Sequence, residues 1–162
     1  MGIKALQNKH RKDRSLMIRA SLLCCALLLL YSQGLFSQVI TNEGAAISVI
    51  PGTVVSSGDL LNNPGGNLLN NGTINLSGNY TSIATSGGDG LYTLGGSWTN
   101  SGGIFIPGAS TVIFNGSNDQ FITRAGGETF YNLSVENSGA PSLMRLGLST
   151  NVNVLGTLTM SL

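Results

Sequence analysis

Apolar and polar residues alternate along short stretches of this chain, most clearly between Thr129 and Met160. Residues 132–135 and 151–154 both show the period of two that is typical of strands with one buried face. Turn-forming Asn, Ser and Gly residues separate these stretches at intervals too short for helices. The pattern therefore predicts successive strands of a winding β structure, at Phe130–Val135, Leu146–Leu148, Val152–Val154 and Thr157–Met160.

The chain before residue 129 is expected to follow the same rules. Strands are predicted at Ala46–Ile50 and Thr53–Val55, and the intervening Pro-Gly turn would make them an opening pair. The segment Ser82–Gly90 is rich in Ser and Gly and is predicted to be a flexible loop that protrudes from the fold. No segment after residue 38 shows helical periodicity, so the expected fold class is all-β.

Two kinds of repetition indicate a solenoid. The hexapeptide GDLLNN at residues 58–63 recurs as GNLLNN at residues 66–71. About 20 residues per coil suit a solenoid in which each coil adds strands to long parallel sheets. A β-sandwich built from the same strands is the alternative. Spacings of 18 to 21 residues separate five apolar residues that are predicted to be equivalent inward positions: Leu76, Leu94, Val112, Leu133 and Val152.

Residues 1–37 have the pattern of a secretory signal peptide, in which a basic segment precedes an apolar run over residues 20–31. Twelve residues in a helix span about 18 Å, well short of the roughly 30 Å hydrocarbon core of a bilayer. The predicted organisation is a signal-peptide helix cleaved between Ser37 and Gln38, followed by a β-repeat segment over residues 38–162. A retained N-terminal membrane anchor is the alternative.

Charge is distributed unevenly, which the formal net charge of +1 conceals. Six of the eight basic residues lie in the first 19 positions. From Gln38 onward there are two arginines and six carboxylates, so the exported part would carry a net charge of −4. A weakly acidic segment without lysine lacks the cationic patch that nucleic-acid binding requires, and nucleic acid is excluded as a partner.

The exported part would contain neither cysteine nor histidine, because Cys24, Cys25 and His10 all lie in the leader. This composition excludes Cys/His zinc sites, Ser-His-Asp triads and Cys-His pairs, and no metal or cofactor is expected. The glycine-rich stretch Gly87–Gly90 superficially resembles a calcium-binding repeat, but it occurs once and lacks the Asp that should follow. Backbone ladders and stacked apolar residues must therefore stabilise the exported part.

Charged residues are sparse, and Asp119, Arg124 and Glu128 form the densest group. Carbohydrate-active β-helix enzymes need carboxylates on neighbouring coils, which Asp119 and Glu128 would supply if the fold brought them together. A solvated loop between two strands is the simpler explanation of the group. Arg145 is expected to be a surface residue.

Tyr80, Tyr92 and Trp98 are the predicted ligand-binding residues, since exposed aromatic rings would stack on sugars. Aromatic residues in strands are more often core residues that stack between neighbouring strands. The sequence leaves both interpretations open.

Five segments share a common repeat pattern, namely GNLLNNGTI (66–74), GSWTNSGGIF (96–105), STVIFNGSNDQFI (110–122), TFYNLSVENSG (129–139) and NVNVLGTLTM (151–160). Their motifs F-N-G-S with Q-x-I, F-x-N-L-x-V and V-x-V-x-G-T-L-x-L, in this order, resemble the repeats of large secreted surface proteins of Bacteroidetes. The resemblance covers about residues 60–162. The leader end Phe36-Ser37-Gln38 is also similar to that of this phylum.

The resemblance implies a right-handed parallel β-helix in a secreted or cell-surface protein that is often cargo of the type IX secretion route. Such proteins often end in a C-terminal sorting domain, which this sequence lacks, so the chain is expected to be an N-terminal piece. The implied function is structural and adhesin-like, without catalytic activity; a carbohydrate-binding or carbohydrate-active β-helix protein is the alternative. Expected partners are a glycan or surface ligand, or a second copy bound through an open strand edge. A membrane would be contacted only through an uncleaved leader.

Overall fold

The computed structural model describes residues 38–139, 144–147 and 150–161. The chain divides into residues 1–36 and 37–162, and the fold presented here is that of the second unit. The predicted leader and its cleavage after Ser37 lie outside the described residues. The described segments contain no helix, and so none that is long and apolar enough to cross a membrane.

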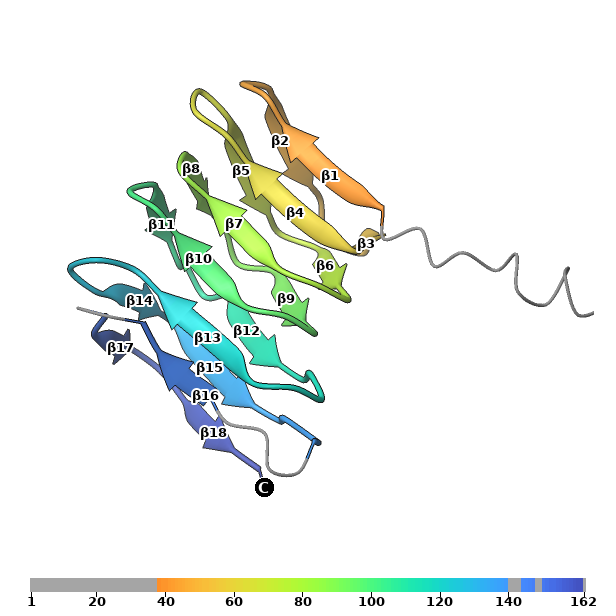
Figure 1. Cartoon of the computed structure of the whole chain (residues 1–162). Coiled ribbons are helices and arrows are strands. Elements are labelled where there is room, and N and C mark those ends of the chain that lie inside the picture. The colour runs from red at the N-terminus through yellow and green to blue at the C-terminus, as the bar shows by residue number, and fades with distance from the viewer. Residues whose placement is uncertain (1–37, 140–143, 148–149, 162) are drawn as a thin grey trace, which may run out of the picture. The chain divides into compact units, whose positions relative to one another are not determined.

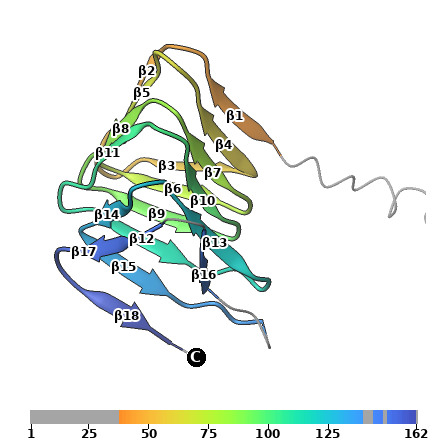
Figure 2. The same cartoon turned by 60° about the vertical axis from the view of Figure 1, so that its left-hand side comes forward.

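Short strands form three walls around a common interior (Figure 1, Figure 2). Sheet A contains β1 (Val39–Asn42), β4 (Asp59–Asn62), β7 (Tyr80–Ser82), β10 (Trp98–Asn100), β13 (Gln120–Thr123) and β16 (Met144–Leu146). Sheet B contains β2 (Ala46–Val49), β5 (Asn67–Asn70), β8 (Thr85–Gly87) and β11 (Ile104–Ile106). Sheet C contains β3 (Val54–Ser57), β6 (Thr73–Leu76), β9 (Leu91–Leu94), β12 (Thr111–Phe114), β15 (Asn132–Val135) and β18 (Leu158–Met160). Sheet D, which continues the wall of sheet B, contains β14 (Glu128–Phe130) and β17 (Val152–Val154).

Consecutive strands lie in different walls, and every third strand returns to the same wall (Figure 2). Neighbouring strands within each sheet are parallel. The register places residues 18 to 25 positions apart side by side, as between Tyr80 and Trp98 or between Leu133 and Leu158. The predicted parallel β-solenoid is therefore confirmed. The β-sandwich alternative does not hold, because sandwiches of that kind are built from antiparallel sheets.

Side chains stack in rows along the interior. Buried positions alternate with partly exposed ones in β6, β9 and β12, as the period of two requires. Ile74, Tyr92 and Val112 are paired in register across these three strands, and each is at most 1% exposed. Burial of apolar area contributes about 25 cal/mol per Å². Each coil therefore stabilises its neighbours through a continuous apolar column.

Glycine is required where the corners of neighbouring coils touch. Gly95 lies so close to the preceding coil that an added Cβ would come within 2.5 Å of the carbonyl oxygen of Ser77. Gly88 has a φ of +112°, which residues with a Cβ rarely adopt, and its Cβ would meet the backbone of Asn70. These glycines let successive corners approach within hydrogen-bonding distance.

Buried polar side chains form a ladder along sheet A, at the last residue of successive strands. Asn42, Asn62 and Ser82 occupy equivalent positions in successive coils, and each is at most 2% exposed. Asn42 Nδ2 donates to Asn62 Oδ1 at 2.9 Å, and Asn62 Nδ2 donates to the carbonyl oxygen of Thr85 at 2.8 Å. Hydrogen bonds between coils thus satisfy polar groups whose burial would otherwise be costly.

Two of the four predicted pairings between equivalent apolar positions are correct. Leu76 pairs with Leu94, and Val112 pairs with Leu133, as predicted. Leu94 pairs instead with Phe114, two residues beyond Val112, because the coil from β9 to β12 is longer than the preceding one. A fixed spacing fails where corners differ in length.

The last predicted step, from Leu133 to Val152, is wrong. Leu133 pairs with Leu158, and Val152 pairs with Glu128 in another wall. Both walls present apolar residues to the interior. Alternation alone therefore cannot assign a strand to its wall.

Several strand boundaries also differ from the predicted ones. The run Phe130–Val135 is two strands, β14 and β15, because the chain turns between walls at Tyr131. β2 and β3 are present but do not form an opening pair, since they lie in different sheets and pair with β5 and β6. β17 matches its predicted range, β18 begins at Leu158, and β16 overlaps its predicted range only at Leu146.

The segment Ser82–Gly90 is not a protruding loop. It contains β8, which pairs with β5 and β11 in sheet B. Ser82 and Ser86 are buried, and the hydroxyl of the buried Tyr80 donates to Ser86 Oγ at 2.6 Å. Small residues line the interior here because the Tyr80 ring fills the space, whereas sequence analysis interpreted them as turn formers.

Replacing Asn62 by Ala should destabilise the solenoid, because Asn42 Nδ2 and the Thr85 carbonyl oxygen would both lose a buried partner. We expect a loss of about 1–3 kcal/mol in the free energy of unfolding, measured by urea denaturation. The matched control is Asn153→Ala on the exposed face of β17, for which we expect a change within about 0.5 kcal/mol. Equal effects of the two substitutions would show that the ladder is not stabilising.

Candidate functional site

The three aromatic residues that sequence analysis assigned to sugar binding form a cluster inside the solenoid. Tyr80, Tyr92 and Trp98 are each 0% exposed. The rings of Tyr80 and Trp98 are stacked, with centroids 4.0 Å apart, and Tyr92 meets Trp98 edge-on at 5.9 Å. The sugar-stacking interpretation is therefore wrong for these residues, because no ring face is available to a ligand. The core interpretation describes them correctly.

Polar groups inside the solenoid fix the position of this cluster. Trp98 Nε1 donates to Glu128 Oε2 at 3.0 Å, and Asn100 Nδ2 donates to the same oxygen at 2.7 Å. Glu128 is the first residue of β14, and it is only 5% exposed, so its carboxylate lies in the interior. Arg124 Nη1 donates to Asn100 Oδ1 at 3.1 Å and is linked to the carboxylate through that amide. These hydrogen bonds connect the coil that contains β10 with the coil that contains β13 and β14.

Burial raises the pKa of Tyr80 from 10.0 to about 12, and the negative charge of Glu128 adds to the increase. The pKa of Tyr92 is raised as well, again chiefly by burial. Both hydroxyls have protein acceptors: Ser86 Oγ for Tyr80, and the carbonyl oxygen of Gly87 at 3.1 Å for Tyr92. Both phenols are therefore held protonated well above neutral pH.

The charged group predicted from the sequence does not come together as an acid/base pair. Asp119 precedes β13 and accepts a hydrogen bond from Arg145 Nε at 2.7 Å on the exterior, whereas Glu128 lies in the interior beyond the other end of β13. A four-residue strand spans about 13 Å. Glycosidase carboxylates are about 5 to 9.5 Å apart. The loop interpretation is correct for Asp119 but wrong for Glu128, and Arg145 is an exposed residue, as predicted.

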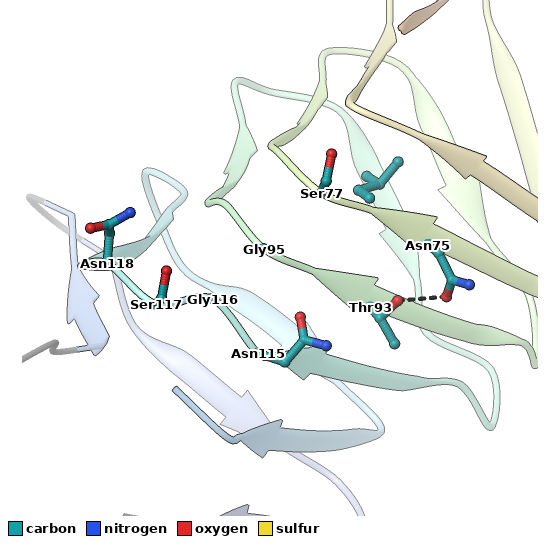
Figure 3. A pocket seen from close by; sticks show the side chains of 9 residues that line it. Asn75, Ser77, Thr93, Gly95, Asn115, Gly116, Ser117 and Asn118 are labelled. Carbon is teal, nitrogen blue, oxygen red and sulfur yellow. Dashed lines mark hydrogen bonds between the residues drawn. The ribbon is translucent and has the colours of Figure 1, made fainter. Parts of the chain in front are cut away.

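A groove lined by uncharged residues lies on the exterior where sheet C ends and the chain turns toward sheet A (Figure 3). We call it the corner groove; its volume is about 670 Å³. It crosses three consecutive coils, at the ends of β6, β9 and β12. Its lining residues are Asn75, Leu76, Ser77, Thr93, Gly95, Asn115, Gly116, Ser117 and Asn118.

One wall of the corner groove is a lengthened corner. Leu94 pairs with Phe114, and Trp98 pairs with Ile122. The four-residue interval between the first members of these pairs therefore corresponds to an eight-residue interval in the next coil. Five residues, 115–119, connect β12 to β13, whereas three connect β9 to β10. Asn115, Ser117 and Asn118 project from this segment, opposite Ser77 and Thr93 (Figure 3).

The lengthened corner is held by two amide side chains. Gln120 is 0% exposed; its Oε1 accepts from Gly116 N at 2.9 Å, and its Nε2 donates to the carbonyl oxygens of Leu94 and Gly96. Asn137 Nδ2 donates to the carbonyl oxygen of Asn118 at 2.7 Å. The groove wall is thus anchored to the coils on either side of it.

Comparisons with protein-family models, curated proteins and solved structures find no match to this chain. Over the described residues, no group of three or more Asp, Glu, His or Cys side chains is placed to hold a metal ion.

The corner groove is not predicted by the sequence. Its lining residues are mostly Asn, Ser, Thr and Gly, which are common throughout the chain and typical of turns. The signal available was the stretch Asn115–Asp119, which follows β12 with five polar or glycine residues, whereas three follow β9. A longer corner next to two shorter ones forms a step on the surface, but only the register reveals it.

Stability should fall at alkaline pH because of the buried tyrosines. The raised pKa of Tyr80 means that the unfolded chain loses its proton near pH 10 and the folded chain near pH 12. Stability from this group is fully present below pH 10 and is lost as pH rises to about 12, with a slope of about 1.4 kcal/mol per pH unit for each such group. Denaturant unfolding across this range should show the fall. Tyr80→Phe should make it shallower; an unchanged slope in this variant would contradict the assignment.

Proposed function

We propose that this chain is an exported structural segment of a secreted or cell-surface protein, adhesin-like in its role and without catalytic activity. Its task is to hold a regular, extended surface in place, so that many weak contacts are made along its walls. A bacterial surface protein that follows the type IX secretion route is the origin that the repeat motifs favour, on the sequence resemblance alone.

The observation that carries the proposal is the use of large aromatic and amide side chains to build the interior. Trp98, Tyr80, Tyr92, Asn62 and Gln120 are each at most 1% exposed, and each contacts or bonds to a neighbouring coil. Stability in such a fold is a sum of contacts between adjacent coils. A fold of this kind can be extended by adding coils, which suits a stalk or a display surface.

The exterior supports the same role. The outward positions of sheet C carry the apolar Val54, Leu91 and Ile113 as well as Thr73, Asn75, Thr93 and Thr111, which are neutral and partly exposed. Their amide and hydroxyl groups both donate and accept hydrogen bonds. A wall of this mixed, uncharged composition suits many weak contacts with a surface.

Self-association through a strand edge belongs to the same proposal. In β18, Leu158 and Met160 pair with the buried Leu133 and Val135, yet they are 54% and 64% exposed. A further coil, or a set of parallel strands from a second copy, would bury them if stacked on this edge.

Export should be visible at the mature N-terminus. If residues 1–37 are a signal peptide, protein recovered from the cell exterior should begin at Gln38, and protease applied to intact cells should degrade it. Terminal sequencing by mass spectrometry provides the measurement. Recovery of an intact Met1 terminus in the cytoplasm would exclude export; an intact leader in the membrane would support the retained anchor.

The absence of catalysis is tested with a panel of polysaccharides. We expect no reducing sugar to be released by the protein, and the same result for Asp119→Asn and Glu128→Gln, because β13 separates these two carboxylates. Release of sugar that disappears on either substitution would establish the carbohydrate-active alternative. Release that survives both substitutions would indicate a contaminating enzyme or a different catalytic residue.

A further inference from the structure

We infer that the corner groove is a binding site for a neutral, hydroxyl-rich ligand of the saccharide class, laid along the axis of the solenoid. This site lies on the exterior of sheet C and is separate from the buried aromatic cluster, which sequence analysis assigned to sugars. It gives the scaffold a defined place of contact.

The lining of the groove sets the class of ligand. Its nine residues include no charged side chain. Asn75, Thr93 and Asn115 supply amide and hydroxyl groups that both donate and accept hydrogen bonds. A sugar hydroxyl also donates and accepts, so it can pair with either kind of group. A charged ligand would lose its hydration without gaining a counter-charge, which is unfavourable.

The register arranges these groups in two rows along the axis. Asn75 and Thr93 are paired in β6 and β9, and the Thr93 hydroxyl donates to Asn75 Oδ1 at 2.6 Å. Ser77, Gly95 and Asn115 each follow the last residue of paired strands and form a second row. Adjacent parallel strands lie about 4.8 Å apart. A linear ligand along the axis would therefore meet a polar group at each coil.

Gly95 leaves the middle of the groove open. A side chain there would collide with the Ser77 carbonyl oxygen, so glycine is needed for packing and also leaves the second row without a side chain between Ser77 and Asn115. Figure 3 shows the labelled side chains on both sides of this gap. The ligand would rest on the backbone of Gly95, between the two polar sides.

The anchoring of the lengthened corner favours binding further. Gln120 and Asn137 fix residues 116–118 by the hydrogen bonds described above. A wall that is ordered before the ligand arrives loses little conformational entropy on binding. This property distinguishes the corner groove from an ordinary exposed turn.

The experiment is a titration of the ¹⁵N-labelled protein with cellohexaose, chitohexaose and, as an anionic comparison, hexagalacturonate. We expect at least one neutral oligosaccharide to shift the amide resonances of Gly95, Gly116 and Ser117. Because no charge lines the groove, the affinity should be the same at low and high salt. Shifts confined to hexagalacturonate and lost at high salt would overturn the inference, as would shifts that map to another wall.

Two variants test the lining residues directly. Asn115→Ala removes one side of the groove, and Thr93→Val removes a hydroxyl while keeping the shape of the side chain. Each should weaken binding about tenfold, which corresponds to about 1.4 kcal/mol. Asn153→Ala removes an equivalent exposed amide from β17 and should leave the affinity unchanged, and thermal unfolding checks that all variants remain folded.

The possible outcomes separate this inference from the proposed scaffold role. If no neutral oligosaccharide shifts the groove amides at millimolar concentration, the binding site is refuted, while export and lack of catalysis are judged by their own measurements. Equal weakening by Asn115→Ala and Asn153→Ala would also refute it, because the contact would then not be local to the groove.

Discussion

Each coil must return to within one strand spacing of the coil before it, and the other features of this solenoid follow from that requirement. Parallel strands about 4.8 Å apart bring equivalent side chains into direct contact. The inward rows must therefore fill the same space coil after coil, as Ile74, Tyr92 and Val112 do. Corners must approach closely, which only glycine permits at Gly95. Buried polar residues must find partners in the next coil, as Asn42 and Asn62 do.

Coils from β13 onward are longer than the earlier ones, and the unusual features of the molecule begin where this change occurs. The coil that contains β13 is longer: Trp98 pairs with Ile122, 24 residues away, whereas Tyr80 pairs with Trp98, 18 residues away. On one wall β11 ends sheet B, and β14 pairs with β17 instead. Glu128 enters the interior at this break. At the opposite end of β13 the extra residues build the corner groove.

This coincidence links stability to the proposed contact site. Gln120 lies fully buried at the start of β13 and holds the groove wall. Beyond the other end of β13, Glu128 accepts hydrogen bonds from Trp98 and Asn100. Both side chains bond to the preceding coil, so the longer coil stays in register despite its additional residues. The regular coils supply the stiffness of the proposed scaffold, and the irregular coil supplies its distinct surface.

The sequence by itself determined the all-β class, the approximate coil length and the places of β2, β3, β15, β17 and β18, because alternation and turn residues are local properties of the chain. It left open which wall a strand joins, so Val152 was paired with the wrong partner, and it treated Ser82–Gly90 as a loop because small buried residues resemble turn formers. Only the tertiary structure decided that Trp98, Tyr80 and Tyr92 are enclosed, since burial depends on the coils above and below. The corner groove likewise exists only through the difference in length between adjacent coils, which becomes a surface feature once the register is set.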